Sequence, residues 1–202
     1  MILFKDNIFY LHTNKTTYSM GVLDDVLVHL YWGKRLYNEF YNDSILNFPH
    51  RHMSALDFGE KSTNYIPLEY SPFGAADLRT TAIGGVHSDG SRLTLLKYKG
   101  YEIENGKPKL KGLPATYVEN DDEATTLELL TEDAVTGIQA VIYYTVFENY
   151  GAMTRRVKVI NNSDKAVDIE RVYSCAVDFS NYDYDMLSLY GRWGKERSLE
   201  KR

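Results

Sequence analysis

Apolar and polar residues alternate with a period of two in several stretches of this chain, and no stretch keeps a helical period. In residues 125–131 the alternation places Leu127 and Leu129 on one face, and residues 153–160 repeat the pattern. Both stretches predict half-buried strands. Residues 137–147 are apolar on both faces, which is typical of a central strand covered from both sides.

Turn residues separate these runs. Glycine and asparagine adopt positive φ readily and close hairpins. Such signals occur at Asp89-Gly90, Asn105-Gly106, Val135–Gly137 and Asn161–Asp164. Strands at this spacing predict a sandwich or a barrel. Because 202 residues with 44% hydrophobic content can bury one full core, we expect a single all-β domain over residues 1–202.

The stretch Phe48–Ala82 departs from this pattern, since it holds three prolines and shows no clear period. Long loops in compact domains are usually functional or disordered. Its aromatic residues, among them Tyr70 and Phe73, can pack against other side chains, and disordered segments are usually poor in such residues. We therefore interpret it as an ordered functional loop.

Charge and composition narrow the class of protein. The net charge is −5, and the 23 basic residues are scattered, so the basic footprint of a nucleic-acid binder is missing. The first residues show no signal-peptide pattern, and no window reaches the apolar length of a membrane span. Cys175 is the single cysteine, which excludes an intrachain disulfide and favours a reducing compartment. We expect a cytoplasmic protein without nucleic-acid or membrane partners.

Several motifs, in the same order and at similar spacing along nearly the whole chain, resemble the amino-terminal domain of the family 36 glycoside hydrolases, the microbial α-galactosidases. They are Phe9–Thr13, Thr17–Met20, His29–Gly33, Leu56-Asp57, Glu69–Gly74, Asp77–Arg79, Leu110–Ala115, Tyr144–Glu148, Thr154–Val157 and Gly191–Arg197. The stretch Phe58–Pro67 is more polar than the family's shorter link, and Phe73 and Leu78 replace more usual neighbours.

The resemblance implies an antiparallel β-sandwich of the galactose-mutarotase-like supersandwich type, placed before a catalytic (β/α)8 barrel. Residues 191–202 are strongly charged and show no closing strand or cap, so we expect the sandwich to be incomplete at its carboxy terminus. Exposed edges and apolar surface would follow. In the family, both catalytic aspartates of the retaining mechanism lie on the barrel. The resemblance therefore implies that this chain carries no catalytic residue and needs no cofactor. It also implies that the protein acts in a bacterial cytoplasm.

Two residues are implied as substrate contacts. Asp57 would hydrogen-bond galactosyl hydroxyls, and Trp193 would line the mouth of a barrel pocket in a neighbouring subunit. The alternatives remain a loop carboxylate bonded to backbone N–H groups and an ordinary core or interface aromatic. Glu69, Asp77 and Arg79 are interpreted as a clamp that fixes the loop rather than as substrate contacts.

Further constellations are weaker. His50 and His52 could share one strand face with a zinc ion, but no third ligand follows, and no metal site is predicted. The acidic groups at Asp121–Glu123 and Asp183–Asp185 lack the spaced ligands of a calcium loop. Arg192, Glu196 and Arg197 could form ion pairs around Trp193 or a solvated tail. Cys175 is expected in a strand over Val167–Val177, as a buried inert thiol.

Three functions are thus kept open. The first is the non-catalytic amino-terminal part of an α-galactosidase acting on terminal α-linked galactose of melibiose or raffinose type, with its own barrel and neighbouring subunits as partners, commonly in a tetramer. The second is a stand-alone carbohydrate-binding sandwich. The third is a structural oligomerisation domain.

Overall fold

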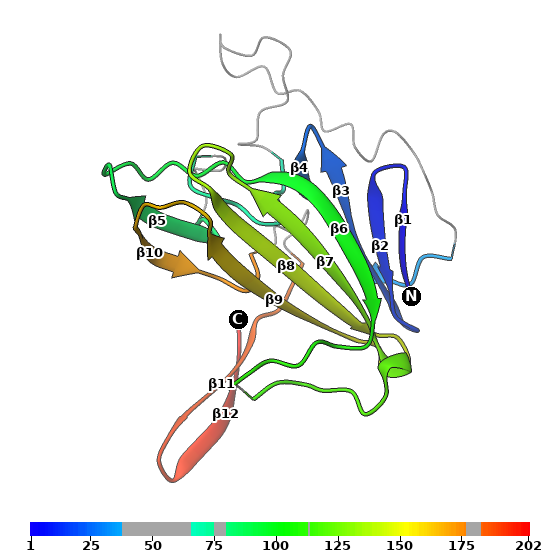
Figure 1. Cartoon of the computed structure of the whole chain (residues 1–202). Coiled ribbons are helices and arrows are strands. Elements are labelled where there is room, and N and C mark those ends of the chain that lie inside the picture. The colour runs from blue at the N-terminus through cyan, green and yellow to red at the C-terminus, as the bar shows by residue number, and fades with distance from the viewer. Residues whose placement is uncertain (38–65, 75–79, 113, 177–182) are drawn as a thin grey trace.

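The computed structural model describes residues 1–37, 66–74, 80–112, 114–176 and 183–202. Within these ranges the regular structure is almost entirely antiparallel strand, with one short 3₁₀ turn, η1 (Asp121–Glu123). In this part of the chain, the strands form two four-stranded sheets, one two-stranded pair and one separate hairpin (Figure 1).

The first sheet is a meander of β1 (Ile2–Lys5), β2 (Ile8–His12), β3 (Thr16–Leu23) and β4 (Val26–Lys34). Two-residue turns join β1 to β2 and β3 to β4. Their residues, Asp6-Asn7 and Asp24-Asp25, all have φ between 49° and 62°. Asparagine and aspartate tolerate this left-handed region, and two consecutive positive φ angles match the twist of the strands that they connect.

The second sheet has the order β6 (Lys97–Asn105), β7 (Thr125–Glu132), β8 (Ile138–Phe147), β9 (Ala152–Asn161). The strands predicted from periodicity are confirmed in it. β8 lies between two neighbours and is buried at nine of its ten positions, as expected for a strand that is apolar on both faces. Gly137, with φ of 74°, ends the turn between β7 and β8.

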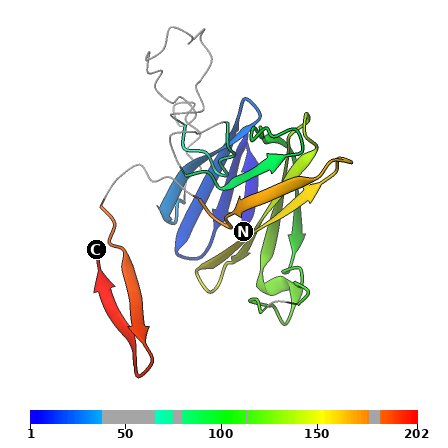
Figure 2. The ribbon, with the colours of Figure 1, turned by 90° about the vertical axis from the view of Figure 1, so that its left-hand side faces the viewer.

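The inner faces of the two sheets form one core. Phe9, Leu11 and Met20 from the first sheet pack in the same cluster as Leu129 and Ile142 from the second. Figure 2 shows the sheets stacked face to face, so the predicted antiparallel β-sandwich is confirmed.

A short pair of strands crosses the side of the sandwich. β5 (Ile83–His87) pairs with β10 (Val167–Val172), and in Figure 2 the pair spans the gap between the two sheets. The remaining strands, β11 (Leu187–Arg192) and β12 (Lys195–Lys201), pair with each other and lie apart from the sandwich in both views.

Of the four predicted hairpin turns, Val135–Gly137 closes a tight hairpin between β7 and β8, and the turn at Asn105-Gly106 begins a longer connection between β6 and β7, which also pair with each other. Gly90 and Gly106 have the expected positive φ, 83° and 81°, but the turn at Gly106 is followed by 18 residues before β7 begins. The turn at Asn161–Asp164 leads from β9 to β10, whose partner is β5. A turn signal reports local backbone conformation, whereas the partner of the next strand depends on the packing of the whole sandwich.

Candidate functional site

Glu69 lies at the edge of the first sheet, where residues 66–72 return to the sandwich. Leu68 forms a β-bridge with Val28, and the backbone N–H of Glu69 donates to the carbonyl of Leu27 at 2.9 Å. These contacts turn the Glu69 side chain inward, where it is completely buried. The sequence-predicted clamp residue is therefore a core carboxylate.

Four side chains surround this carboxylate, and together with it we call them the Glu69 cluster: Glu69, Tyr18, His29, Tyr144 and Arg155. The Tyr18 hydroxyl donates to both carboxylate oxygens at 2.6 and 2.8 Å, and the Tyr144 hydroxyl donates to Oε1. Arg155 Nη1 lies 2.9 Å from Oε1, and His29 Nδ1 lies 3.6 Å from Oε2. Because Tyr18 and His29 belong to the first sheet and Tyr144 and Arg155 to the second, the cluster joins both layers to the returning segment.

The electrostatics of the cluster follow from burial and pairing. Burial alone would raise the pKa of Glu69, but the Arg155 guanidinium and the hydrogen bonds around the carboxylate outweigh it and lower that pKa. Burial, followed by the charge of Glu69, raises the pKa of Tyr18 and of Tyr144 well above 10.0. The two hydroxyls thus stay protonated and act as donors to an ionised carboxylate.

Arg155 also contacts a second part of the chain. Its Nη2 donates to the carbonyl of Glu69 at 2.9 Å, and its Nη1 lies 3.4 Å from Cys175 Sγ. The prediction of a buried thiol in a strand was wrong, because β10 ends at Val172 and Cys175 is exposed. One guanidinium therefore fixes the residues that follow the loop and those that precede the β11–β12 hairpin.

Trp193 lies in the two-residue turn of the β11–β12 hairpin, and its side chain is 97% exposed. Two glycines of the motif, Gly191 and Gly194, allow the chain to form this hairpin. Gly194 has a φ of 73°, and a Cβ on Gly191 would lie 2.4 Å from the carbonyl oxygen of Lys195. The structure places Trp193 away from the buried Glu69, so these two candidate residues are not brought together.

The same hairpin corrects two expectations about residues 191–202. They do contain a paired strand, β12, because Gly191 and Gly194 allow the chain to reverse. Among the described residues, the structure shows no ion pair linking Arg192, Glu196 and Arg197; Glu196 instead accepts the backbone N–H of Gly194 at 2.9 Å.

The hairpin also exposes apolar surface, as expected. Leu189 pairs with Leu199 across the two strands, and Leu187 lies on the same face; they are 62–66% exposed.

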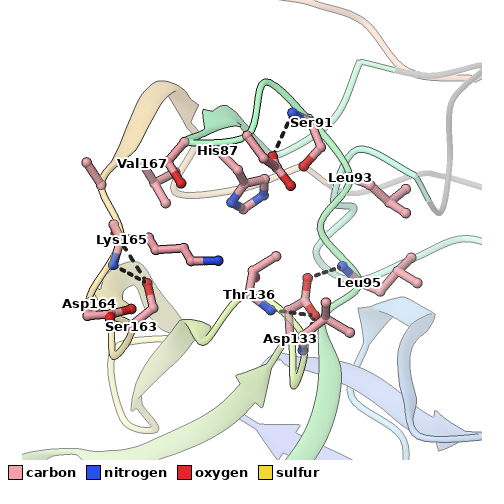
Figure 3. Close-up of a pocket in the computed structure, with 14 residues that line it drawn as sticks. His87, Ser91, Leu93, Leu95, Asp133, Thr136, Ser163, Asp164, Lys165 and Val167 are labelled. Atoms are coloured by element: carbon pink, nitrogen blue, oxygen red, sulfur yellow. Dashed lines mark hydrogen bonds between the residues drawn. The ribbon is translucent and has the colours of Figure 1, made fainter.

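A cavity of about 470 Å³ lies on another part of the surface, between the β5–β10 pair and the β7–β8 turn (Figure 3). The side chains of His87, Thr136 and Lys165 converge on it, and Leu93 and Val167 supply apolar walls. None of the candidate site residues predicted from the sequence lines this cavity, but three of the predicted turns do, through Asp89, through Val135 and Thr136, and through Ser163 and Asp164.

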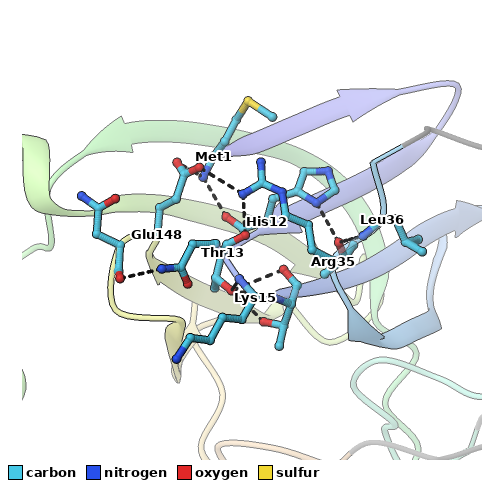
Figure 4. A network of polar contacts seen from close by, with 11 residues as sticks. Met1, His12, Thr13, Lys15, Arg35, Leu36 and Glu148 are labelled. Carbon is cyan, nitrogen blue, oxygen red and sulfur yellow. Dashed lines mark hydrogen bonds and ion pairs between the residues drawn. The ribbon is translucent and has the colours of Figure 1, made fainter.

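A polar network holds the first strands against the β8–β9 turn (Figure 4). The Met1 ammonium contacts Glu148 Oε2 at 2.9 Å, and Arg35 Nη1 donates to the carbonyl of Thr13 at 2.6 Å. The backbone N–H of Leu36 donates to Thr17 Oγ1 at 2.9 Å. The hydrogen bond from the Met1 ammonium lowers the pKa of Glu148, and the charges of Met1 and Arg35 add to this effect and together outweigh the opposing effect of burial.

Replacing Glu148 by glutamine is expected to change the free energy of unfolding by less than about 1 kcal/mol, because the side chain is 42% exposed and water screens its ion pairs. Urea unfolding at neutral pH measures this. A loss above about 2 kcal/mol would contradict the assignment of this network as a surface feature.

Asp57, Asp77 and Arg79 lie outside the described residues, as do His50 and His52. Among the residues that the structure describes, no group of three or more His, Cys, Asp or Glu side chains could hold a metal ion. In the same residues, no helix has the length and apolarity needed to cross a membrane.

Comparison with known proteins identifies the chain. The model of the glycosyl hydrolase family 36 N-terminal domain matches residues 25–202. This chain belongs to that family. The α-galactosidase AgaA of Geobacillus stearothermophilus is 34% identical over 197 residues, which cover 96% of this chain and 27% of AgaA. Mel36A of Lactobacillus acidophilus is also 34% identical, with 98% of this chain and 28% of Mel36A covered.

Solved family 36 structures show the same fold. The crystal structure of AgaB from Geobacillus stearothermophilus has a TM-score of 0.88 and 34% identity, covering all of this chain and 28% of AgaB. The galactosidase domain of the α-galactosidase–sucrose kinase AgaSK has a TM-score of 0.89 and 32% identity, with 100% and 29% covered. This family 36 chain thus spans between a quarter and a third of the length of these relatives.

Sequence reasoning missed Tyr18, His29, Tyr144 and Arg155 as partners of Glu69. One signal was available for Arg155. It lies on the same strand face as Met153, Val157 and Val159, which pack against the core, so it interrupts an apolar period-two run. A charged residue at such a position requires a buried partner of opposite charge.

Proposed function

We propose that this chain is the amino-terminal domain of an α-galactosidase that hydrolyses terminal α-D-galactosyl residues of melibiose or raffinose type with retention of configuration. The single observation that carries this proposal is the similarity of nearly the whole chain to family 36 enzymes, including AgaA, a variant of which was solved in complex with raffinose. Residues 1–202 would form one β-sandwich domain, without a catalytic residue of its own.

The chemistry would lie on the (β/α)8 barrel of the longer protein. Retaining hydrolysis needs two carboxyl groups about 5 Å apart across the scissile bond, one as nucleophile and one as acid and base. In barrel enzymes such groups lie at the carboxyl ends of the strands. The buried carboxylate of this domain, Glu69, is occupied by two hydroxyls and a guanidinium, so it has no oxygen to offer to a substrate.

This domain would contribute binding contacts and subunit contacts. Trp193 would line the pocket mouth of a neighbouring barrel, and its almost complete exposure on a protruding hairpin supports a partner outside this chain. Asp57 would hydrogen-bond galactosyl hydroxyls, and the Glu69 cluster would fix the segment that returns from it. The enzyme would act as a homo-oligomer, with a tetramer as the expected form, in the bacterial cytoplasm.

A structural oligomerisation domain is the second candidate. The observation that favours it is the exposed apolar face of Leu187, Leu189 and Leu199 on the hairpin. In that case Trp193 would bury its ring against another subunit and would not touch the sugar.

Release of aryl alcohol from an aryl α-galactoside tests the activity, with the full-length gene product and the 202-residue chain compared. We expect turnover by the long protein and none by the short one. Activity of the short chain would contradict the barrel location of the catalytic carboxylates, and inactivity of both would contradict the proposed function.

Substitutions in the full-length protein separate the two candidates. Trp193→Ala and Asp57→Asn are each expected to raise KM about tenfold or more, the effect of losing about 1.4 kcal/mol of binding free energy. Tyr117→Ala removes an exposed aromatic elsewhere and serves as the matched control. Unchanged KM and kcat in both variants, with an altered oligomer size, would favour the structural role.

A further inference from the structure

We propose that the cavity between the β5–β10 pair and the β7–β8 turn is a binding site for a small neutral polyol, of the size and chemistry of one hexose unit. The cavity volume of about 470 Å³ lies within the range of ligand pockets, about 300–1,000 Å³. The inference stands whether or not the proposed function is correct.

The walls of the cavity are held in place before any ligand arrives. Asp133 is 4% exposed, and its carboxylate accepts the backbone N–H of Leu95 at 3.0 Å and of Val135 at 2.9 Å. It thereby ties the loop after β5 to the β7–β8 turn. His87 Nε2 lies 3.0 Å from Thr94 Oγ1, which fixes the imidazole on the opposite wall. A prearranged site loses little conformational entropy on binding.

Lys165 supplies the polar centre of the cavity. Its backbone is fixed, since the Asn161 amide donates to the Lys165 carbonyl at 2.7 Å and its own N–H donates to Ser163 Oγ at 3.3 Å. Figure 3 shows its side chain extending between His87 and Thr136. Within the described residues its ammonium makes no ion pair, so its three N–H donors are available to a ligand.

The mixture of groups selects a polyol over an ion. A sugar hydroxyl both donates and accepts, and here the ammonium of Lys165, the hydroxyl of Thr136 and the carboxylate of Asp89 offer both functions. The aliphatic walls of Leu93 and Val167 match the C–H face of a pyranose ring. An anion would meet the carboxylates around the single ammonium, a juxtaposition of like charges that disfavours it.

The test measures binding of D-galactose and D-glucose to the full-length protein by saturation-transfer NMR and calorimetry. Lys165→Met removes the charged donor but keeps the length of the side chain. Lys99→Met is the matched control, because Lys99 is also an exposed lysine, on β6, and does not line the cavity. Thermal unfolding of both variants verifies that they are folded.

We expect Lys165→Met to weaken hexose binding about tenfold, the usual effect of losing a charge-assisted hydrogen bond, and Lys99→Met to leave it unchanged. Turnover of the aryl α-galactoside should be the same in both variants. Equal hexose affinity in the two variants, or no hexose binding at all, would overturn the proposal. Displacement of the hexose by inorganic phosphate would also overturn it, because the site would then select anions.

Discussion

Replacing Arg155 by methionine is expected to lower the free energy of unfolding by about 3–5 kcal/mol, the usual cost of leaving one member of a buried ion pair without its partner. Arg155 is 9% exposed and Glu69 is fully buried, so water cannot replace the guanidinium. In the variant, the Glu69 carboxylate would still accept hydrogen bonds from the Tyr18 and Tyr144 hydroxyls but would lack the positively charged guanidinium beside it. Urea unfolding measures the loss, and the melting temperature should fall by roughly 6–20 °C.

Arg156→Met is the control for this experiment. Arg156 is the next residue on β9, and its guanidinium lies 3.4 Å from the centre of the Tyr143 ring on the outer face of the sheet. Losing this contact should cost no more than about 1 kcal/mol. The double variant Glu69→Leu with Arg155→Met removes both charges and should recover part of the loss, because the Tyr18 and Tyr144 hydroxyls then lack their acceptor. Equal losses for Arg155→Met and Arg156→Met would contradict the importance assigned to the Glu69 cluster.

Acid is expected to unfold the protein in a way that depends on Glu69. Its pKa in the folded protein is lower than 4.5, so the unfolded chain binds a proton at a higher pH than the folded one does. The stability from this group is therefore fully present above pH 4.5 and is lost as the pH falls toward the lower, folded pKa. The free energy of unfolding should decrease by up to about 1.4 kcal/mol for each pH unit in this window.

Glu69→Gln removes the titrating group and keeps the shape of the side chain. It should lower the free energy of unfolding at pH 7, because the charge of Arg155 then stays buried without its counter-ion. Below pH 4.5 the free energy of unfolding should fall less steeply with pH, by up to the slope that one proton contributes. Glu148 and Glu170, which also have lowered pKa values, are present in both proteins and cancel in the comparison. Identical acid slopes in the two proteins would show that Glu69 does not titrate in this window.

For the candidate site, sequence reasoning reached Glu69 and Trp193 but not what surrounds them. Gly191 and Gly194 allow the strand β12, yet the charge of residues 191–202 predicts a tail without a strand. A tail rich in charge and a solvated hairpin look alike in sequence, because neither buries an apolar face. The exposure of Cys175 was missed for a related reason, since the end of β10 depends on its pairing with β5.

By itself, the sequence determined three strands of the second sheet, β7, β8 and β9, together with the two-sided burial of β8 and the positive φ of the glycine turns. These are local properties, because the direction of a side chain on a strand and the φ of a glycine depend on the nearest residues. Only the tertiary structure decided that Glu69 would meet Tyr18, 51 residues away, and Arg155, 86 residues away, and that β10 would pair with β5. Such contacts depend on how the two sheets stack. Because a carboxylate in the core is stable only beside a cation and hydrogen-bond donors, the buried charge of Glu69 requires those partners.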